Sequence, residues 1–159
     1  MGEIHHCNLG TEMSIVAWDG KSIAADKMSI SDGMCTTVTK IVRLDDGRVA
    51  AWVGETSIGL ALLEWIKTGN PDKWPVTQRT ENWACLIVAN WDGVIFYERE
   101  PFAQEVHEPF MAWGSGRDFA IGAMAMGANA KQAVEIANTF STTCGNGIRC
   151  FNLIDEGGC

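Results

Sequence analysis

The apolar positions of this chain gather into short runs separated by turn residues, which is the pattern of strands joined in hairpins. Residues 14–26 form two such runs around the pair Asp19-Gly20. Asp-Gly between apolar runs is the strongest short-range signal for a β-hairpin. Further strand patterns cover residues 40–44 and 48–53. The chain therefore opens with strands that pair with their neighbours in sequence.

A helix is predicted next, over residues 58–68. Apolar side chains recur there at helical spacing, and Thr56 or Ser57 supplies a hydroxyl that can cap the first turn. The run Gly69-Asn70-Pro71 ends the helix, because glycine accepts a left-handed backbone and proline cannot continue the hydrogen-bond ladder.

The second half of the chain has the same order of strands followed by helices. Strand patterns at residues 83–90 and 94–98 form another hairpin. Two helices follow at residues 118–126 and 130–138, and Asn129 can cap the second of them.

A last strand pattern covers residues 148–154. Strands in hairpins together with helices in pairs favour an α+β fold over a doubly wound parallel sheet. The pattern alone predicts antiparallel sheet covered by helices.

Composition narrows the classes of function. The chain has 159 residues and a net charge of −8. An acidic chain is not expected to bind nucleic acid, which needs clustered Lys and Arg. No apolar run approaches the ~20 residues of a membrane helix, so no membrane partner is expected. We expect a single domain over residues 14–159 and a leader or propeptide over residues 1–13, which lack the apolar core of a signal peptide.

The cysteines favour neither a metal centre nor a disulfide framework. None of the six is in Cys-x-x-Cys spacing, and Cys85 lies inside an apolar strand pattern. Adjacent ligands such as His5-His6-Cys7, with no distant partner, are weak evidence for a metal. We therefore expect reduced thiols, a cytoplasmic location, and neither metal nor cofactor.

The candidate chemistry lies in the first hairpin and the strand after it. Ser14 and Asp26 stand at the two ends of the hairpin, and Lys40 begins the next strand pattern. A hydroxyl, a carboxylate and an amine are the parts of an activated nucleophile. The ordinary alternative is a strand residue, a strand-end cap and a solvated lysine. His107 lies in a polar linker without a nucleophile-elbow motif, so a Ser-His-Asp triad is not expected.

Four segments carry a resemblance to a known family, and they are Ala24-Ala25-Asp26, Thr39-Lys40-Ile41-Val42-Arg43-Leu44, Ala50-Ala51-Trp52-Val53-Gly54 and Gly114-Ser115-Gly116-Arg117-Asp118. They resemble the catalytic subunits of proteasome-type peptidases, the N-terminal nucleophile hydrolases. The Ala-rich helix pair resembles most closely the compact bacterial and phage-type members. The resemblance extends from about Ser14 to Leu153. It implies a four-layer αββα sandwich of the N-terminal nucleophile hydrolase type.

The resemblance also implies a role for each matching residue. Ser14 would be the nucleophile and its own α-amine the base, with Asp26 and Lys40 beside it. The Ala51 N–H would stabilise the oxyanion and Ser115 would complete a proton relay. Ser115 also fits an ordinary helix N-cap.

By the same analogy, the substrate pocket would include Ile30, Ala51 and Trp52. Two departures from the family stand out: Ser14 replaces the usual threonine, and Ser141 stands near where an aspartate orients the family's serine. Cleavage after Gly10 would make Thr11 the nucleophile instead of Ser14.

What the resemblance implies is a self-compartmentalising peptidase that acts on peptides or unfolded proteins. It would form closed rings, and the helix surface around residues 122–128 has the small side chains that suit such contacts. No Gly-x-x-x-x-Gly-Lys-Ser/Thr motif occurs, so an ATPase unfoldase would be a separate protein. The alternative is a catalytically inactive ring-forming scaffold subunit of the same fold.

Overall fold

The computed structural model describes residues 14–76 and 81–159. The predicted leader, the alternative nucleophile Thr11 and the segment His5-His6-Cys7 lie outside the described residues. Within the described residues, no helix has the length and apolar character needed to cross a membrane.

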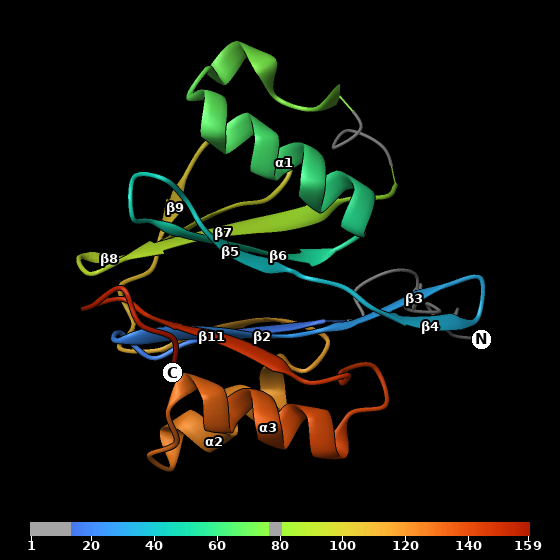
Figure 1. Ribbon diagram of the computed structural model, residues 1–159, viewed down its shortest axis with the longest axis vertical. Helices are drawn as coiled ribbons and strands as arrows, with labels where there is room; N and C mark the ends of the chain where they lie inside the picture. Colours follow the sequence, from blue (N-terminus) through green and yellow to red (C-terminus); the bar gives the residue numbers. More distant parts are fainter. Residues whose placement is uncertain (1–13, 77–80) are drawn as a thin grey trace, which may run out of the picture.

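Two antiparallel sheets form the centre of the molecule (Figure 1). The first has the strand order β10-β1-β2-β11, and the second has the order β5-β6-β7-β8-β9. The strands of the first sheet are β1 (Ile15–Trp18), β2 (Ser22–Asp26), β10 (Met111–Gly114) and β11 (Ile148–Asn152). Those of the second are β5 (Ile41–Arg43), β6 (Val49–Gly54), β7 (Ala84–Asn90), β8 (Gly93–Tyr97) and β9 (Gln104–Glu105).

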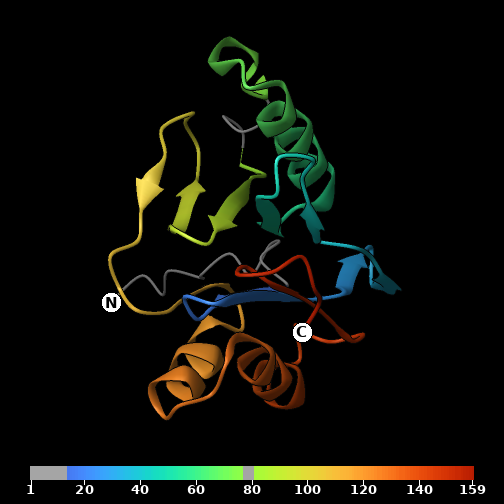
Figure 2. The same ribbon diagram turned by 60° about the vertical axis from the view of Figure 1, so that its left-hand side comes forward.

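Helices cover the outer faces of both sheets. Helix α1 (Thr56–Thr68) lies on the five-stranded sheet, while α2 (Arg117–Ala125) and α3 (Ala130–Phe140) lie on the four-stranded sheet (Figure 1). Figure 2 shows the two sheets facing each other between these helices. The mixed α and β architecture predicted from the pattern is therefore confirmed.

The uniform apolar character of β1 and β2 follows from burial on both faces. Val16 and Ile23 belong to the apolar cluster between the two sheets. Their neighbours Ile15 and Ala24 belong to the cluster that packs under α2 and α3. Since alternate residues of a strand face opposite sides, a strand with both sides covered must be apolar throughout.

The helix ends agree with the predicted stop signal and differ at one start. Gly69 ends α1 in a left-handed backbone with φ 64°, as predicted. Neither Thr56 nor Ser57 caps that helix, because Glu55 is the N-cap. The Glu55 carboxylate accepts a hydrogen bond from the Ser57 hydroxyl at 2.7 Å and makes no capping bond to the backbone.

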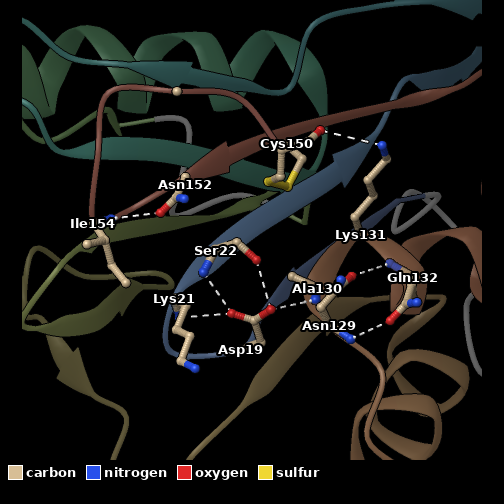
Figure 3. Close-up of a disulfide and its surroundings, with 12 residues drawn as sticks. Asp19, Lys21, Ser22, Asn129, Ala130, Lys131, Gln132, Cys150, Asn152 and Ile154 are labelled. Carbon is tan, nitrogen blue, oxygen red and sulfur yellow. Dashed lines mark hydrogen bonds between the residues drawn. A yellow bond between two sulfur atoms is a disulfide. The ribbon is translucent and has the colours of Figure 1, made fainter.

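The predicted hairpin turn at Asp19 also joins the first sheet to α3 (Figure 3). Its carboxylate accepts hydrogen bonds from the N–H groups of Lys21 at 2.9 Å and Ser22 at 2.7 Å, and from the N–H of Ala130 at 2.8 Å. Burial raises the pKa of Asp19, but the hydrogen bonds from Ala130, Lys21 and Ser22 outweigh it and hold that pKa below its ordinary value. Asn129 caps α3 as predicted.

Two cysteines expected to be thiols are paired. Cys150 in β11 and Cys159 form a disulfide, with their Cα atoms 5.3 Å apart (Figure 3). The chain turns back after β11, where the Asn152 N–H donates to the Gly157 carbonyl at 3.0 Å. The expectation of reduced cysteines is therefore wrong for this pair, because it rested on compartment and spacing rather than on this turn. Cys85 is buried, as predicted.

One hairpin was missed from the sequence. Strands β3 (Met28–Ser31) and β4 (Met34–Thr37) form a separate two-stranded sheet that extends beyond the main sheets (Figure 1). Its turn is Asp32-Gly33, with φ values of 49° and 77°. The same Asp-Gly pair predicts the turn at residue 19, but β4 is exposed along its whole length and so lacks an apolar run.

Candidate active site

Among the described residues, three polar or charged side chains are buried, and they are Ser14, Asp26 and Lys40, each 1% exposed. Ser14 directly precedes β1 and Asp26 ends β2, so hairpin pairing brings the two together. Lys40 directly precedes β5 in the facing sheet. The fold thus gathers at one place three residues that the sequence marks as candidates.

Lys40 is the centre of this cluster. Its Nζ donates hydrogen bonds to Asp26 Oδ1 at 2.7 Å, to Ser14 Oγ at 3.1 Å and to the Met28 carbonyl oxygen at 2.5 Å. An ammonium group has three donors, and each of them has an acceptor here. Burial lowers the pKa of Lys40, while the Asp26 carboxylate opposes that change and favours the charged form.

Asp26 is held by the backbone as well as by Lys40. Its carboxylate accepts hydrogen bonds from the N–H groups of Ile15 at 3.1 Å, Gly145 at 3.1 Å and Met28 at 3.4 Å. A buried carboxylate needs such compensation, because removing a charge from water costs several kcal/mol. The contacts hold the side chain in one position and satisfy its charge.

Ser115 reaches the cluster from the loop before α2. The Ser14 N–H donates to Ser115 Oγ at 3.3 Å, and the Gly116 N–H donates to the Ser14 carbonyl oxygen at 3.3 Å. Gly114 has φ 98°, and a side chain there would overlap the Ser14 carbonyl oxygen, so only glycine allows this approach. Ser115 does not cap α2, whose N-cap is Gly116.

The resemblance draws attention to Ser141, but the sequence gives no sign that Thr143 belongs to the site. Ser115 Oγ lies 2.7 Å from Thr143 Oγ1, which lies 2.9 Å from Ser141 Oγ. Thr143 has no motif around it that identifies it. It becomes visible only when the loop after α3 folds against the loop before α2.

A cavity of 480 Å³ opens beside Ser14. Two walls are formed by the β3–β4 hairpin and by the start of α1, and the described residues that line it are Ser14, Met28, Ser29, Ile30, Ser31, Asp32, Gly54, Glu55, Thr56, Ser57 and Asn82. Of the pocket residues expected by analogy, only Ile30 is in this set. Trp52 is 1% exposed and belongs to the core under α1.

The structure does not bring Ala51 to this cavity. Ala51 is fully buried in the middle of β6, where it pairs with Ile41 of β5 on one side and Ile87 of β7 on the other. The part of β6 that reaches the cavity is its last residue, Gly54. After Gly54, the cavity lining continues along the chain through Glu55, Thr56 and Ser57, at the turn into α1.

Solved structures show which fold this is. BPH of Thiobacillus denitrificans in complex with epoxomicin is 20% identical to this chain with a TM-score of 0.69, and the match covers 88% of this chain and 98% of that one. HslV of Trypanosoma brucei is 16% identical with a TM-score of 0.65, covering 87% and 98%. No protein-family model and no curated protein sequence matches the chain. The chain therefore has the proteasome-type fold of HslV and BPH.

Proposed function

We propose that this chain is a proteasome-type peptidase, an N-terminal nucleophile hydrolase on a four-layer αββα sandwich, with Ser14 as its nucleophile. The observation that carries the proposal is the 3.1 Å contact between Ser14 Oγ and Lys40 Nζ, beside a cavity large enough for a peptide side chain. The likeness in fold to HslV and BPH supports the same class.

In this proposal the base is the α-amine of Ser14 itself. Lys40 is unsuited to that task, because its three N–H donors all have acceptors and Asp26 favours its charged form. An α-amine has an ordinary pKa of about 7.7–8.0, and a neighbouring ammonium lowers it toward neutral pH. While Met13 precedes Ser14, that nitrogen is a peptide amide without basicity. Activity therefore requires the Met13–Ser14 bond to be broken.

The proposed reaction has two stages. The Ser14 amine takes the hydroxyl proton as Oγ bonds to the substrate carbonyl carbon, and the proton then passes to the leaving amine as the peptide bond breaks. Water then attacks the resulting ester, with the same amine as base, and releases the carboxylic acid. The first N–H groups of α1 have no partner within the helix and belong to a cavity wall, so they can stabilise the oxyanion.

The test uses a chain that can be cut after it has folded. Residues 8–13 are replaced by Glu-Asn-Leu-Tyr-Phe-Gln, so that a site-specific protease cleaves directly before Ser14. The matched control has one extra glycine after the glutamine, so its new terminus precedes Ser14 by one residue. We expect hydrolysis of short fluorogenic peptides only by the chain that begins at Ser14.

Equal activity of both cut chains would show that the amine of Ser14 is not the base. Activity in neither favours the inactive scaffold subunit. Intact-mass measurement of the natively expressed protein separates cleavage before Ser14 from cleavage before Thr11.

We also propose self-association into rings, with peptides or unfolded proteins as substrates and a separate ATPase as unfoldase. Exposed apolar side chains on α2 and α3 and just after α2 support an interface there: Phe119 is 44% exposed, Met126 89% and Phe140 64%. Light scattering should detect a particle many times the mass of the 17.3 kDa subunit.

The cytoplasmic location stays a prediction, and the Cys150–Cys159 disulfide removes one reason for it.

A further inference from the structure

A chain of hydroxyl groups runs from the nitrogen of Ser14 into the loop after α3. The Ser14 N–H donates to Ser115 Oγ at 3.3 Å. Ser115 Oγ is 2.7 Å from Thr143 Oγ1, and that oxygen is 2.9 Å from Ser141 Oγ. The three side chains come from two loops far apart in sequence, so their alignment is a property of the folded chain.

Either hydroxyl of each pair can be the donor, and the distances favour one direction of donation along this hydroxyl chain. Ser115 Oγ accepts from the Ser14 N–H, so its own proton is free to point elsewhere. Thr143 Oγ1, at 2.7 Å, is a closer acceptor for that proton than the Ser14 carbonyl oxygen, at 3.3 Å. When Thr143 accepts from Ser115, its own hydroxyl is left to donate to Ser141 Oγ. In this arrangement Ser115 presents a lone pair, and not its proton, to the Ser14 nitrogen.

The loop that carries Thr143 is anchored on both sides of the site. The Thr143 N–H donates to Ser141 Oγ at 3.2 Å, which fixes the turn after α3. Two residues further on, the Gly145 N–H donates to Asp26 Oδ2 at 3.1 Å. One short loop thus contacts both the hydroxyl chain and the carboxylate that holds Lys40.

We propose that Thr143 is a positioning residue, which orients the Ser115 hydroxyl so that Ser115 holds the Ser14 nitrogen toward Ser14 Oγ. This inference rests on the proposed function, because orientation of that nitrogen matters for catalysis only when it is the base. The hydroxyl chain formed by Ser115, Thr143 and Ser141 is called the relay below. Its hydroxyls are neutral, so it places no negative charge beside the Ser14 amine.

Among the described residues, the ionisable groups near the relay are paired with each other, neutral or exposed. Asp26 and Lys40 form an ion pair with each other, at 2.7 Å. Cys144 lies 3.9 Å from Ser115 Oγ, and burial together with Asp26 raises the pKa of its thiol, which keeps it neutral. Arg117 and Asp118, at the start of α2, are exposed and pair with each other at 3.5 Å. A carboxylate placed at residue 141 would therefore be a new charge beside the relay.

The first test compares Thr143→Val with Thr143→Ser in the chain cut before Ser14. Valine keeps the shape of threonine and removes the hydroxyl, while serine keeps the hydroxyl. We expect Thr143→Val to lower kcat by about 10- to 100-fold through loss of orientation, with KM unchanged, since Thr143 is not among the described residues that line the cavity. Thr143→Ser should retain most of the activity.

The second test follows the charge of the amine. Ser141→Asp should move the acid limb of the pH–rate profile to higher pH, because an anion favours the protonated amine. Thr142→Asp adds the same charge at an exposed neighbouring residue and serves as the control, with a smaller shift expected. NMR titration of the Ser14 α-amine in serine-labelled protein reports the same pKa without turnover.

Several results would overturn the proposal. They are wild-type kcat in Thr143→Val, an equal loss in Thr143→Ser, or an amine pKa that Ser141→Asp moves no more than Thr142→Asp does. Thermal melting of each variant identifies one that fails to fold. If the cut wild-type chain hydrolyses no peptide, the proposed function fails, and the NMR titration alone then decides whether the relay contacts the amine.

Discussion

Two cavities of similar size lie at opposite ends of β6, and their charged groups differ sharply. The cavity at Ser14 measures 480 Å³ and adjoins Asp26 and Lys40, which are 1% exposed. The other measures 420 Å³ and is lined by Arg48, Glu105 and His107 among others. The side chains of Glu105 and His107 are 73% and 83% exposed.

The two cavities therefore have similar volumes. They differ in whether the charged side chains beside them are buried. An exposed ion pair contributes little to the free energy of unfolding, so its presence needs no functional explanation. A buried pair is often no more stable than an apolar one of the same volume, so its presence calls for another reason. The nucleophilic chemistry proposed for Ser14 would supply such a reason.

The largest effect is expected from Lys40→Ala. It should abolish peptide hydrolysis by the chain cut before Ser14 and lower the free energy of unfolding by about 3–5 kcal/mol, because Asp26 is left buried without its partner. Peptide turnover and urea unfolding measure the two effects. Wild-type turnover in Lys40→Ala would contradict the proposed mechanism.

The double variant Asp26→Asn with Lys40→Met separates these two effects. It replaces both charges with neutral side chains of similar volume, so most of the lost stability should return. Activity should not return, because the ammonium beside Ser14 is still missing. A double variant as unstable as Lys40→Ala would show that the pair is needed for folding, and the contrast between the cavities would lose its meaning.

An intermediate effect is expected at Asp19, which is partly buried. Asp19→Asn loses a charged acceptor for the Ala130 N–H, and the free energy of unfolding should fall by about 1–2 kcal/mol at neutral pH. The pKa of Asp19 is lowered in the folded chain, so its contribution is complete above about pH 3.9, the ordinary value, and is lost as the pH falls through the lower folded value.

Unfolding of wild type and Asp19→Asn should therefore converge in strong acid. A difference that stays constant down to acid pH would place the effect in packing rather than charge.

The smallest effects are expected in the second cavity. His107→Ala should change the free energy of unfolding by less than about 0.5 kcal/mol, because the side chain is mostly solvated. Arg48→Ala loses a largely solvated pair with Asp46, in which the two side chains are 33% and 52% exposed, and should cost at most about 1 kcal/mol. Neither should alter peptide turnover. A large loss of turnover in either variant would make the second cavity part of the active site.

Local signals in the sequence were enough for the elements that depend on neighbouring residues. The Asp19-Gly20 turn, the left-handed Gly69 and the Asn129 cap each act within a few residues, so their residue types identify them. The same holds for Ser14 and Asp26, because a single hairpin brings them together.

Contacts between distant segments could be identified only in the folded chain. Ser115 lies 101 residues from Ser14, and its partner Thr143 carries no motif. The turn after β11 places Cys159 beside Cys150, where spacing had suggested free thiols. The position of Ala51 away from the cavity likewise depends on how β6 pairs with both neighbours.

The physical reason is the range of the interactions involved. Turns and caps are set by backbone preferences and hydrogen bonds within a few residues, which the order of amino acids encodes directly. The relay, the disulfide and the cavity depend on how two sheets and their helices pack, and packing depends on the whole apolar core at once. The sequence of this chain therefore identifies the groups that could take part in the proposed catalysis. Only the packing of the folded chain decides which of these groups lie in contact.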